Sequence, residues 1–220
     1  MNKPTTAPPK LSILLSLLAL TSVFSLAIPA LQPHALADDA PAKSAVNSPL
    51  VLDLDKGNGS VTFDAVGKPS ALKIHAKGDA PKGRLTVTGG KVAGTVSLKL
   101  DSLDTGIGMR NEHMKKRYLE TDKYPEARLT ITELNLPANY AAPDFAADKL
   151  PFKGMLSLHG VEKPVEGTAK VSRSGDDLSL EAHFGLKIED FEIKLPTFAG
   201  ITMASDVSCG VEAKAPFKAQ

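Results

Sequence analysis

Ser157 and His159 are the residues closest to a hydrolase motif, in the segment GMLSLHG (residues 154–160). A nucleophile elbow of the Gly-x-Ser-x-Gly type needs glycines two residues from the serine on each side. Here both glycines stand three residues away, so the spacing is wrong. On a regular strand both side chains would share the outward face, and the sequence assigns no third group to orient the histidine. We therefore expect no catalytic residues and no enzyme activity.

Three histidines are candidates for metal ligands. His75, His159 and His183 each lie beside apolar residues that the alternation turns inward, so the histidines should point outward. The sequence has no His-x-x-x-His pair and no cysteine cluster, which are the usual spacings of zinc or iron ligands. We expect no metal site and no cofactor.

Cys209 is the one cysteine of the chain, so it cannot form an internal disulfide. It alternates with Val207 and Val211 and should share their face of a strand. A small buried apolar side chain is therefore expected here, in preference to a nucleophile.

The elements that position these groups follow from the hydrophobic pattern. From residue 50 onward apolar residues recur at every second position, as in a half-buried strand. Turn signals at residues 56–59, 88–90 and 174–177 separate the runs. Such a series indicates an antiparallel sandwich or barrel. In the last apolar residues before Pro196, the alternation shifts by one position, so Phe191 and Ile193 would fall on the opposite face of a regular strand. This shift predicts a bulge or bend near Glu189 and Asp190.

Residues 104–124 break the alternation and contain helix-forming residues. Asp104 or Thr105 could cap the helix at its start, and Pro125 would end it. The pattern thus predicts a short helix inserted between two strands of one domain.

One face of this helix carries Ile107, Met114 and Tyr118, and should pack on the strands. Arg110 and His113 are three residues apart and share a face. They could meet the polar end of a ligand at the mouth of a barrel, or they could hold the helix on the barrel rim. Both alternatives remain open from the sequence.

The first 37 residues are expected to be an export signal. Two early lysines precede an apolar stretch at residues 11–28, Pro29 and Pro33 follow, and Ala35-Leu36-Ala37 offers a cleavage site before Asp38. The alternative is an uncleaved membrane anchor, because the apolar stretch approaches the ~20 residues that span a bilayer.

Three segments result: a signal peptide (1–37), a flexible mature N-terminus (38–49) and one barrel domain (50–220). No cysteine near the cleavage site could carry a lipid. We expect a periplasmic or secreted protein without stable membrane insertion after cleavage.

Several segments in order resemble the YceI-like family across residues 50–215. The matching segments are LDTGIGMRNEHM (103–114), YLET (118–121), KYPEA (123–127), FKG (152–154), LSLHGVEKPV (156–165), FGL (184–186), DFEI (190–193) and Pro196. The opening LVLDLD (50–55) and FDAVGKP (63–69) depart from the start that many members show.

The resemblance implies an all-β fold, an eight-stranded antiparallel lipocalin-like β-barrel with a helix near one mouth. It also implies an apolar tunnel for a polyisoprenoid, an isoprenoid quinone or a fatty acid derivative, in the periplasm or outside the cell. Dimers occur in the family, so a homodimer is an open alternative to a monomer. Because of the departures, the usual ligand need not carry over.

The interior of such a barrel is just wide enough to be filled by side chains or to hold one slim ligand. The residues expected to line it and to bind lipid are Phe63, Ile74, Leu85, Val96, Leu98, Met109, Arg110, His113, Met114, Phe152, Leu156, Leu158, Phe184, Leu186 and Phe191.

The leading hypothesis is therefore a protein that transports, stores or sequesters a long apolar amphiphile. The alternative is a packed barrel that acts in stress or assembly through protein–protein contacts. The 26 Lys and Arg nearly balance the 25 Asp and Glu, so the chain lacks the basic surplus typical of nucleic-acid binding.

A polar substitution on the inward face tests this assignment. We expect Phe184→Asp either to unfold the barrel or to abolish ligand uptake, because burying an unpaired carboxylate costs several kcal/mol. Circular dichroism and the lipid content of the purified protein measure the two effects. A folded variant that copurifies with lipid at wild-type occupancy would show that Phe184 does not face inward.

Overall fold

The computed structural model describes residues 49–68, 72–198 and 201–219. The expected signal peptide and its cleavage site lie outside the described residues, so both stay predictions. Within the described part, the chain forms the strands β1 (Leu50–Asp53), β2 (Asn58–Lys68), β3 (Lys73–Gly78), β4 (Lys82–Thr88), β5 (Lys91–Lys99), β6 (Glu126–Leu134), β7 (Asp144–Leu158), β8 (Val161–Ser174), β9 (Asp177–Lys187), β10 (Thr197–Phe198) and β11 (Ile201–Ala219).

Short helical segments connect some of these strands. The helix α1 (Gly108–His113) continues as a π-helical turn, Met114–Tyr118, between β5 and β6. Single 3₁₀ turns lie at Leu54–Lys56, Leu100–Ser102 and Ile188–Phe191.

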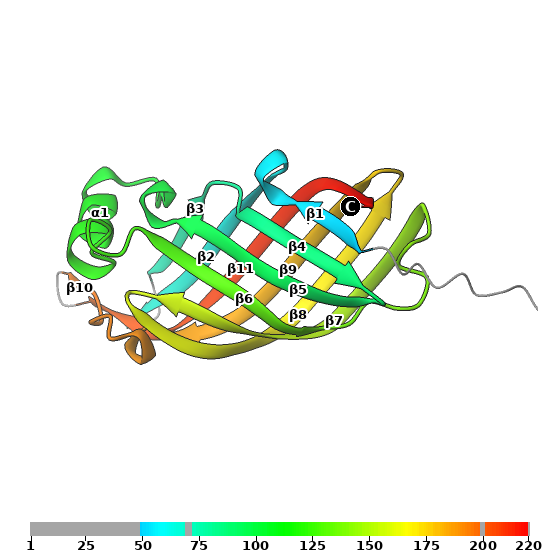
Figure 1. The fold of residues 1–220 in the computed structure, drawn as a ribbon. Coiled ribbons are helices and arrows are strands. Elements are labelled where there is room, and N and C mark those ends of the chain that lie inside the picture. The colour runs from blue at the N-terminus through cyan, green and yellow to red at the C-terminus, as the bar shows by residue number, and fades with distance from the viewer. Residues whose placement is uncertain (1–48, 69–71, 199–200, 220) are drawn as a thin grey trace, which may run out of the picture. The chain divides into compact units, whose positions relative to one another are not determined.

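The described strands close into an antiparallel barrel, as expected. The pairing order β1-β4-β5-β6-β7-β8-β9-β11 returns to its start because β1 also pairs with β11, which gives a ring of eight strands. Where the short β1 no longer pairs with β11, β2 takes its place as the neighbour of β11. The strand β3 then pairs with the other edge of β2. Figure 1 shows α1 at one end of this barrel and the end of β11 at the other. The closed ring leaves few strand edges exposed.

The alternating pattern fills the two ends of the barrel with different apolar clusters. The first cluster includes Leu52 and Phe217, which are 3% and 1% exposed, at the end where β11 finishes. Arg173 covers this end: its guanidinium lies 5.4 Å from the Phe217 ring centroid, and its Nη1 donates to the carbonyl of Ala141. The second cluster includes Leu158, Ile188 and Phe191.

The helix begins later than the sequence predicts, and the expected cap is wrong. Ile107 precedes α1 in an extended conformation and makes no side-chain cap. Asp104 cannot start the helix because its backbone exchanges two hydrogen bonds with Lys77 of β3, at 2.8 and 2.9 Å. This pairing keeps Asp104 extended. The helical segment also ends at Tyr118, well before Pro125.

The predicted bulge or bend near Glu189 and Asp190 is present as a 3₁₀ turn. Glu192 follows with a φ of 60°, in the left-handed region. This turn redirects the chain after β9, so residues beyond it do not continue the inward face of the strand.

Gly167 of β8 gives a stability test, because it lies between Phe152 of β7 and Phe184 of β9 in the sheet. The two rings meet edge to face with centroids 6.0 Å apart. A methyl group at Gly167 would overlap the carbonyl oxygen of His183 and lie 2.9 Å from Cε1 of Phe152. We expect Gly167→Ala to lower the free energy of unfolding by about 1–3 kcal/mol.

The matched control is Gly185→Ala, since the nearest atom to its added methyl group is 4.0 Å away. We expect it to stay within about 0.5 kcal/mol of the wild type in urea unfolding. Equal losses for the two variants would contradict the close packing described around Gly167.

Candidate ligand-binding cavity

A cavity of about 620 Å³ lies inside the barrel, with lining residues from both apolar clusters. Leu52 and Phe217 do not line it, so the first cluster closes one end. At the other end Ile107 and Met109 line the cavity and are also 49% and 64% exposed. The cavity therefore reaches solvent beside α1.

The lining is mostly apolar, with a few hydroxyl-bearing residues such as Thr62 and Ser97. Among the described residues, its basic side chains at the mouth are Arg110, His113 and Arg117, all from one helical segment that also contributes Tyr118 to the lining. No Asp or Glu of the described chain belongs to the lining. An apolar wall with a few polar groups at one end is typical of a site for a molecule with one polar end.

The structure places most of the predicted site residues together. Those that line the cavity are Phe63, Ile74, Leu85, Val96, Leu98, Met109, Arg110, His113, Met114, Phe152, Leu156, Leu158, Phe184 and Leu186. Whether they bind lipid stays a prediction.

Phe191 is the exception, and its placement in the lining is wrong. It is 1% exposed and packs in the second apolar cluster, whose members Leu158 and Ile188 do line the cavity. The reason is the 3₁₀ turn of which Phe191 is the last residue, since this turn takes it off the inward face of β9.

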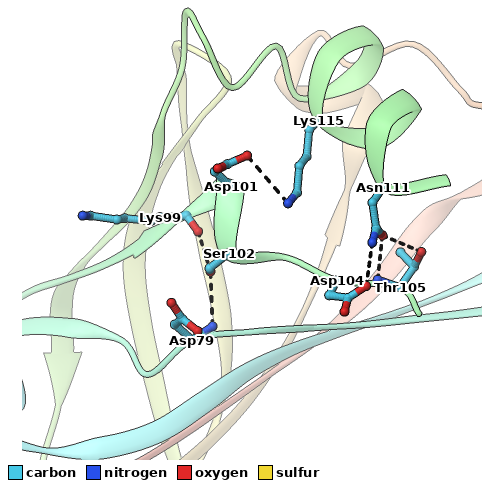
Figure 2. A network of polar contacts seen from close by, with 8 residues as sticks. All are labelled: Asp79, Lys99, Asp101, Ser102, Asp104, Thr105, Asn111 and Lys115. Carbon is cyan, nitrogen blue, oxygen red and sulfur yellow. Dashed lines mark hydrogen bonds and ion pairs between the residues drawn. The ribbon is translucent and has the colours of Figure 1, made fainter. Parts of the chain in front are cut away.

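The structure also bears on the two roles left open for Arg110 and His113. Neither side chain makes a hydrogen bond or ion pair with another described residue. The helix is instead held by Asn111, whose Nδ2 donates to Asp104 Oδ1 at 2.6 Å and whose Oδ1 accepts from the backbone and hydroxyl of Thr105 (Figure 2). Lys115 adds an ion pair to Asp101, with N and O 3.6 Å apart. Arg110 and His113 are thus not the anchors of this helix.

The match to known proteins extends over nearly the whole barrel. The model of the YceI-like domain matches residues 52–215.

The chain belongs to the YceI-like family.

Among curated relatives, the chain is similar to a UPF0312 protein of Photorhabdus laumondii, with 35% identity over 106 residues, 45% of this chain and 50% of that protein. It is also similar to Protein YceI of Salmonella arizonae, with 31% identity over 143 residues, 62% of this chain and 59% of that protein. The chain spans about half the length of the curated relatives it matches.

Two solved structures share the fold. A polyisoprenoid binding domain from Saccharophagus degradans has a TM-score of 0.56 and 17% identity, and the match covers 79% of this chain and 99% of that one. BcnA of Burkholderia cenocepacia has a TM-score of 0.58 and 18% identity, over 74% of this chain and 99% of that one. At such identities the likeness concerns the barrel fold.

Cys209 of this YceI-like barrel lines the cavity. Burial, with a smaller effect of the Asp64 carboxylate, raises the pKa of the thiol to about 12. Because the thiolate is the nucleophile, Cys209 acts as part of the apolar wall.

His159 has a structural role between two turns and does not line the cavity. Its Nδ1 lies 3.1 Å from the carbonyl oxygen of Phe191, and its Nε2 lies 2.9 Å from Oε2 of Glu120. The Tyr124 ring packs on it with centroids 4.5 Å apart. Both ring nitrogens are therefore engaged with partners other than Ser157. The prediction that His159 points away from the cavity is confirmed.

Arg117 is a lining residue that the sequence reasoning missed. It follows His113 by four residues and Arg110 by seven, so all three fall on one helical face. This spacing was the signal that could have found it.

The described residues hold no cluster of three His, Cys, Asp or Glu side chains suited to a metal ion. No helix in this part of the chain is long and apolar enough to cross a bilayer.

The hydrogen bonds of Asp104 that anchor α1 should make the stability of this helix depend on pH. The side-chain N–H of Asn111, then the backbone N–H of Gly106 and the charge of Lys115, lower the pKa of Asp104 below its ordinary 3.8. A carboxyl group with a lowered pKa stabilises the fold above its ordinary pKa, and this contribution is lost as the pH falls through the folded value. We expect the protection factors of the amides of residues 108–118, which are exchange rates corrected for the intrinsic effect of pH, to decrease as the pH falls below 3.8.

Asn111→Ala should move the pKa of Asp104 back toward 3.8, as followed by carboxyl NMR. Asp53 is the internal control, because its lowered pKa depends first on Lys56. An Asp104 pKa that does not respond to Asn111→Ala would refute the anchoring role of Asn111.

Proposed function

We propose that this protein is a binding protein, which holds one long apolar amphiphile inside its barrel and performs no chemistry on it. The observation that carries the proposal is the apolar cavity of about 620 Å³ with one open end. Burying apolar surface contributes roughly 25 cal/mol per Å², so a chain-like molecule gains affinity along its whole length.

The size of the cavity limits what it can enclose. A water-sized group takes about 30 Å³, so the cavity holds on the order of 20 such groups. A fatty acyl chain has that size, and a longer polyisoprenoid or quinone tail would extend through the mouth. The name of the S. degradans neighbour, a polyisoprenoid binding domain, supports the same class of ligand.

We also propose that the protein works in the periplasm or outside the cell, where it transports, stores or sequesters its ligand. The support is the sequence of residues 1–37, with its lysines, apolar stretch and Ala35-Leu36-Ala37 site. The bound amphiphile is cargo, and the proposal includes no cofactor. The alternative of a packed barrel is not favoured, because side chains leave the interior unfilled.

The test is native and denaturing mass spectrometry of protein purified without detergent, together with an organic extract. We expect one apolar molecule per chain. A protein that is free of ligand and takes up neither quinones nor fatty amides would overturn the proposal.

Two variants on β5 sharpen this test. Val96 lines the cavity, and Ala93 on the same strand is exposed and outside the lining. We expect Val96→Phe to reduce ligand occupancy because the larger side chain fills the cavity, while Ala93→Phe leaves occupancy unchanged. Equal occupancy in both variants would place the ligand elsewhere.

A further inference from the structure

We propose that the amphiphile carries an acidic head group, a carboxylate or a phosphate, which Arg110, His113 and Arg117 bind at the mouth of the cavity. This inference rests on the proposed function and adds the chemical class of the ligand's polar end. The three side chains, named here the basic collar, all line the cavity and all come from residues 108–118.

The acids near this segment are already engaged with other partners. Glu112 pairs with Lys116, with N and O 3.2 Å apart, and lies outside the lining. Asp101 pairs with Lys115, and Asp104 accepts from Asn111 and Gly106. The basic collar therefore faces the cavity without an acidic lining residue, among those described, to neutralise it.

Two features favour an anion at this place. Arginine presents a planar fork of donors that matches carboxylate and phosphate oxygens in bidentate pairs. The collar also borders the apolar wall of the cavity, so an anionic head group bound there leaves the attached chain free to enter the barrel. A neutral alcohol or amide could accept a hydrogen bond from arginine but would not neutralise its charge.

The backbone that carries the collar is held in place before any ligand arrives. The bonds of Asn111 to Asp104 and Thr105 fix the start of the helix, and the Lys115–Asp101 pair fixes the next turn (Figure 2). Because this backbone is anchored by other residues, ligand binding has to order only the side chains of the collar.

The test compares oleate, oleyl alcohol and oleamide, which share one chain and differ in the head group. Affinities are measured at low salt for the wild type and for the double variant Arg110→Gln/Arg117→Gln. We expect oleate to bind the wild type about tenfold or more tightly than the two neutral probes. The double variant should lose about tenfold in oleate affinity and keep its affinity for oleyl alcohol.

Lys116→Gln is the matched control, because Lys116 lies on the same segment, carries the same charge and does not line the cavity. It should leave the preference for oleate intact. Oleyl phosphate in a parallel series separates the two acids, and a preference for either acid over the alcohol supports the inference.

Two results would overturn the inference. The first is equal binding of oleate, oleyl phosphate and oleyl alcohol to the wild type. The second is an equal loss of oleate affinity in the double variant and in Lys116→Gln, which would indicate a general effect of surface charge. In both cases uptake of the alcohol would leave the proposed function standing, whereas a wild type that binds none of the probes would remove both.

Discussion

The structure depends on the closure of its sheet between β1 and β11. Only a short stretch forms this seam: Leu50, Val51 and Leu52 pair with the last residues of β11 and, on their other side, with β4. Leu52 pairs with Phe217 of β11 on one side and with Leu85 of β4 on the other, and all three are buried. Apolar packing therefore also holds this seam. Closure satisfies the backbone groups of the edge strands and encloses a space that an open sheet would not have.

That space is closed at one end and open at the other for identifiable reasons. Phe217 and its neighbours fill the end where β11 finishes, under the guanidinium of Arg173. At the opposite end the chain leaves the sheet after β5 and forms α1, which Asn111 ties to the loop before it. The helix thus borders an opening, and it brings the basic side chains to an otherwise apolar wall. The charged lining side chains are confined to the mouth, while the interior offers mostly apolar contact.

The sequence predicted the strands and the inward face well, because period-two alternation is a local signal. It could not choose between a sandwich and a barrel, because both use the same inward residues and the closing pairs come from the two ends of the domain. The cavity itself could not be predicted, because the alternation of apolar residues identifies the inward side chains but not the volume they leave empty. The prediction of Asp104 as a cap was wrong because a long-range pairing with Lys77 overrides its local preference. The prediction of Phe191 as a lining residue was wrong because a 3₁₀ turn follows the end of β9.

The central claim, that the chain of the ligand lies inside the barrel, is tested most directly by isotope-filtered NMR of the protein loaded with ¹³C-labelled oleate. We predict contacts from the oleate chain to the methyl groups of Leu129, Ile131 and Val211, which line the cavity from two strands, β6 and β11. We predict none to Val66, which is 41% exposed and outside the lining. Contacts to Val66 without contacts to the lining methyl groups would contradict the account.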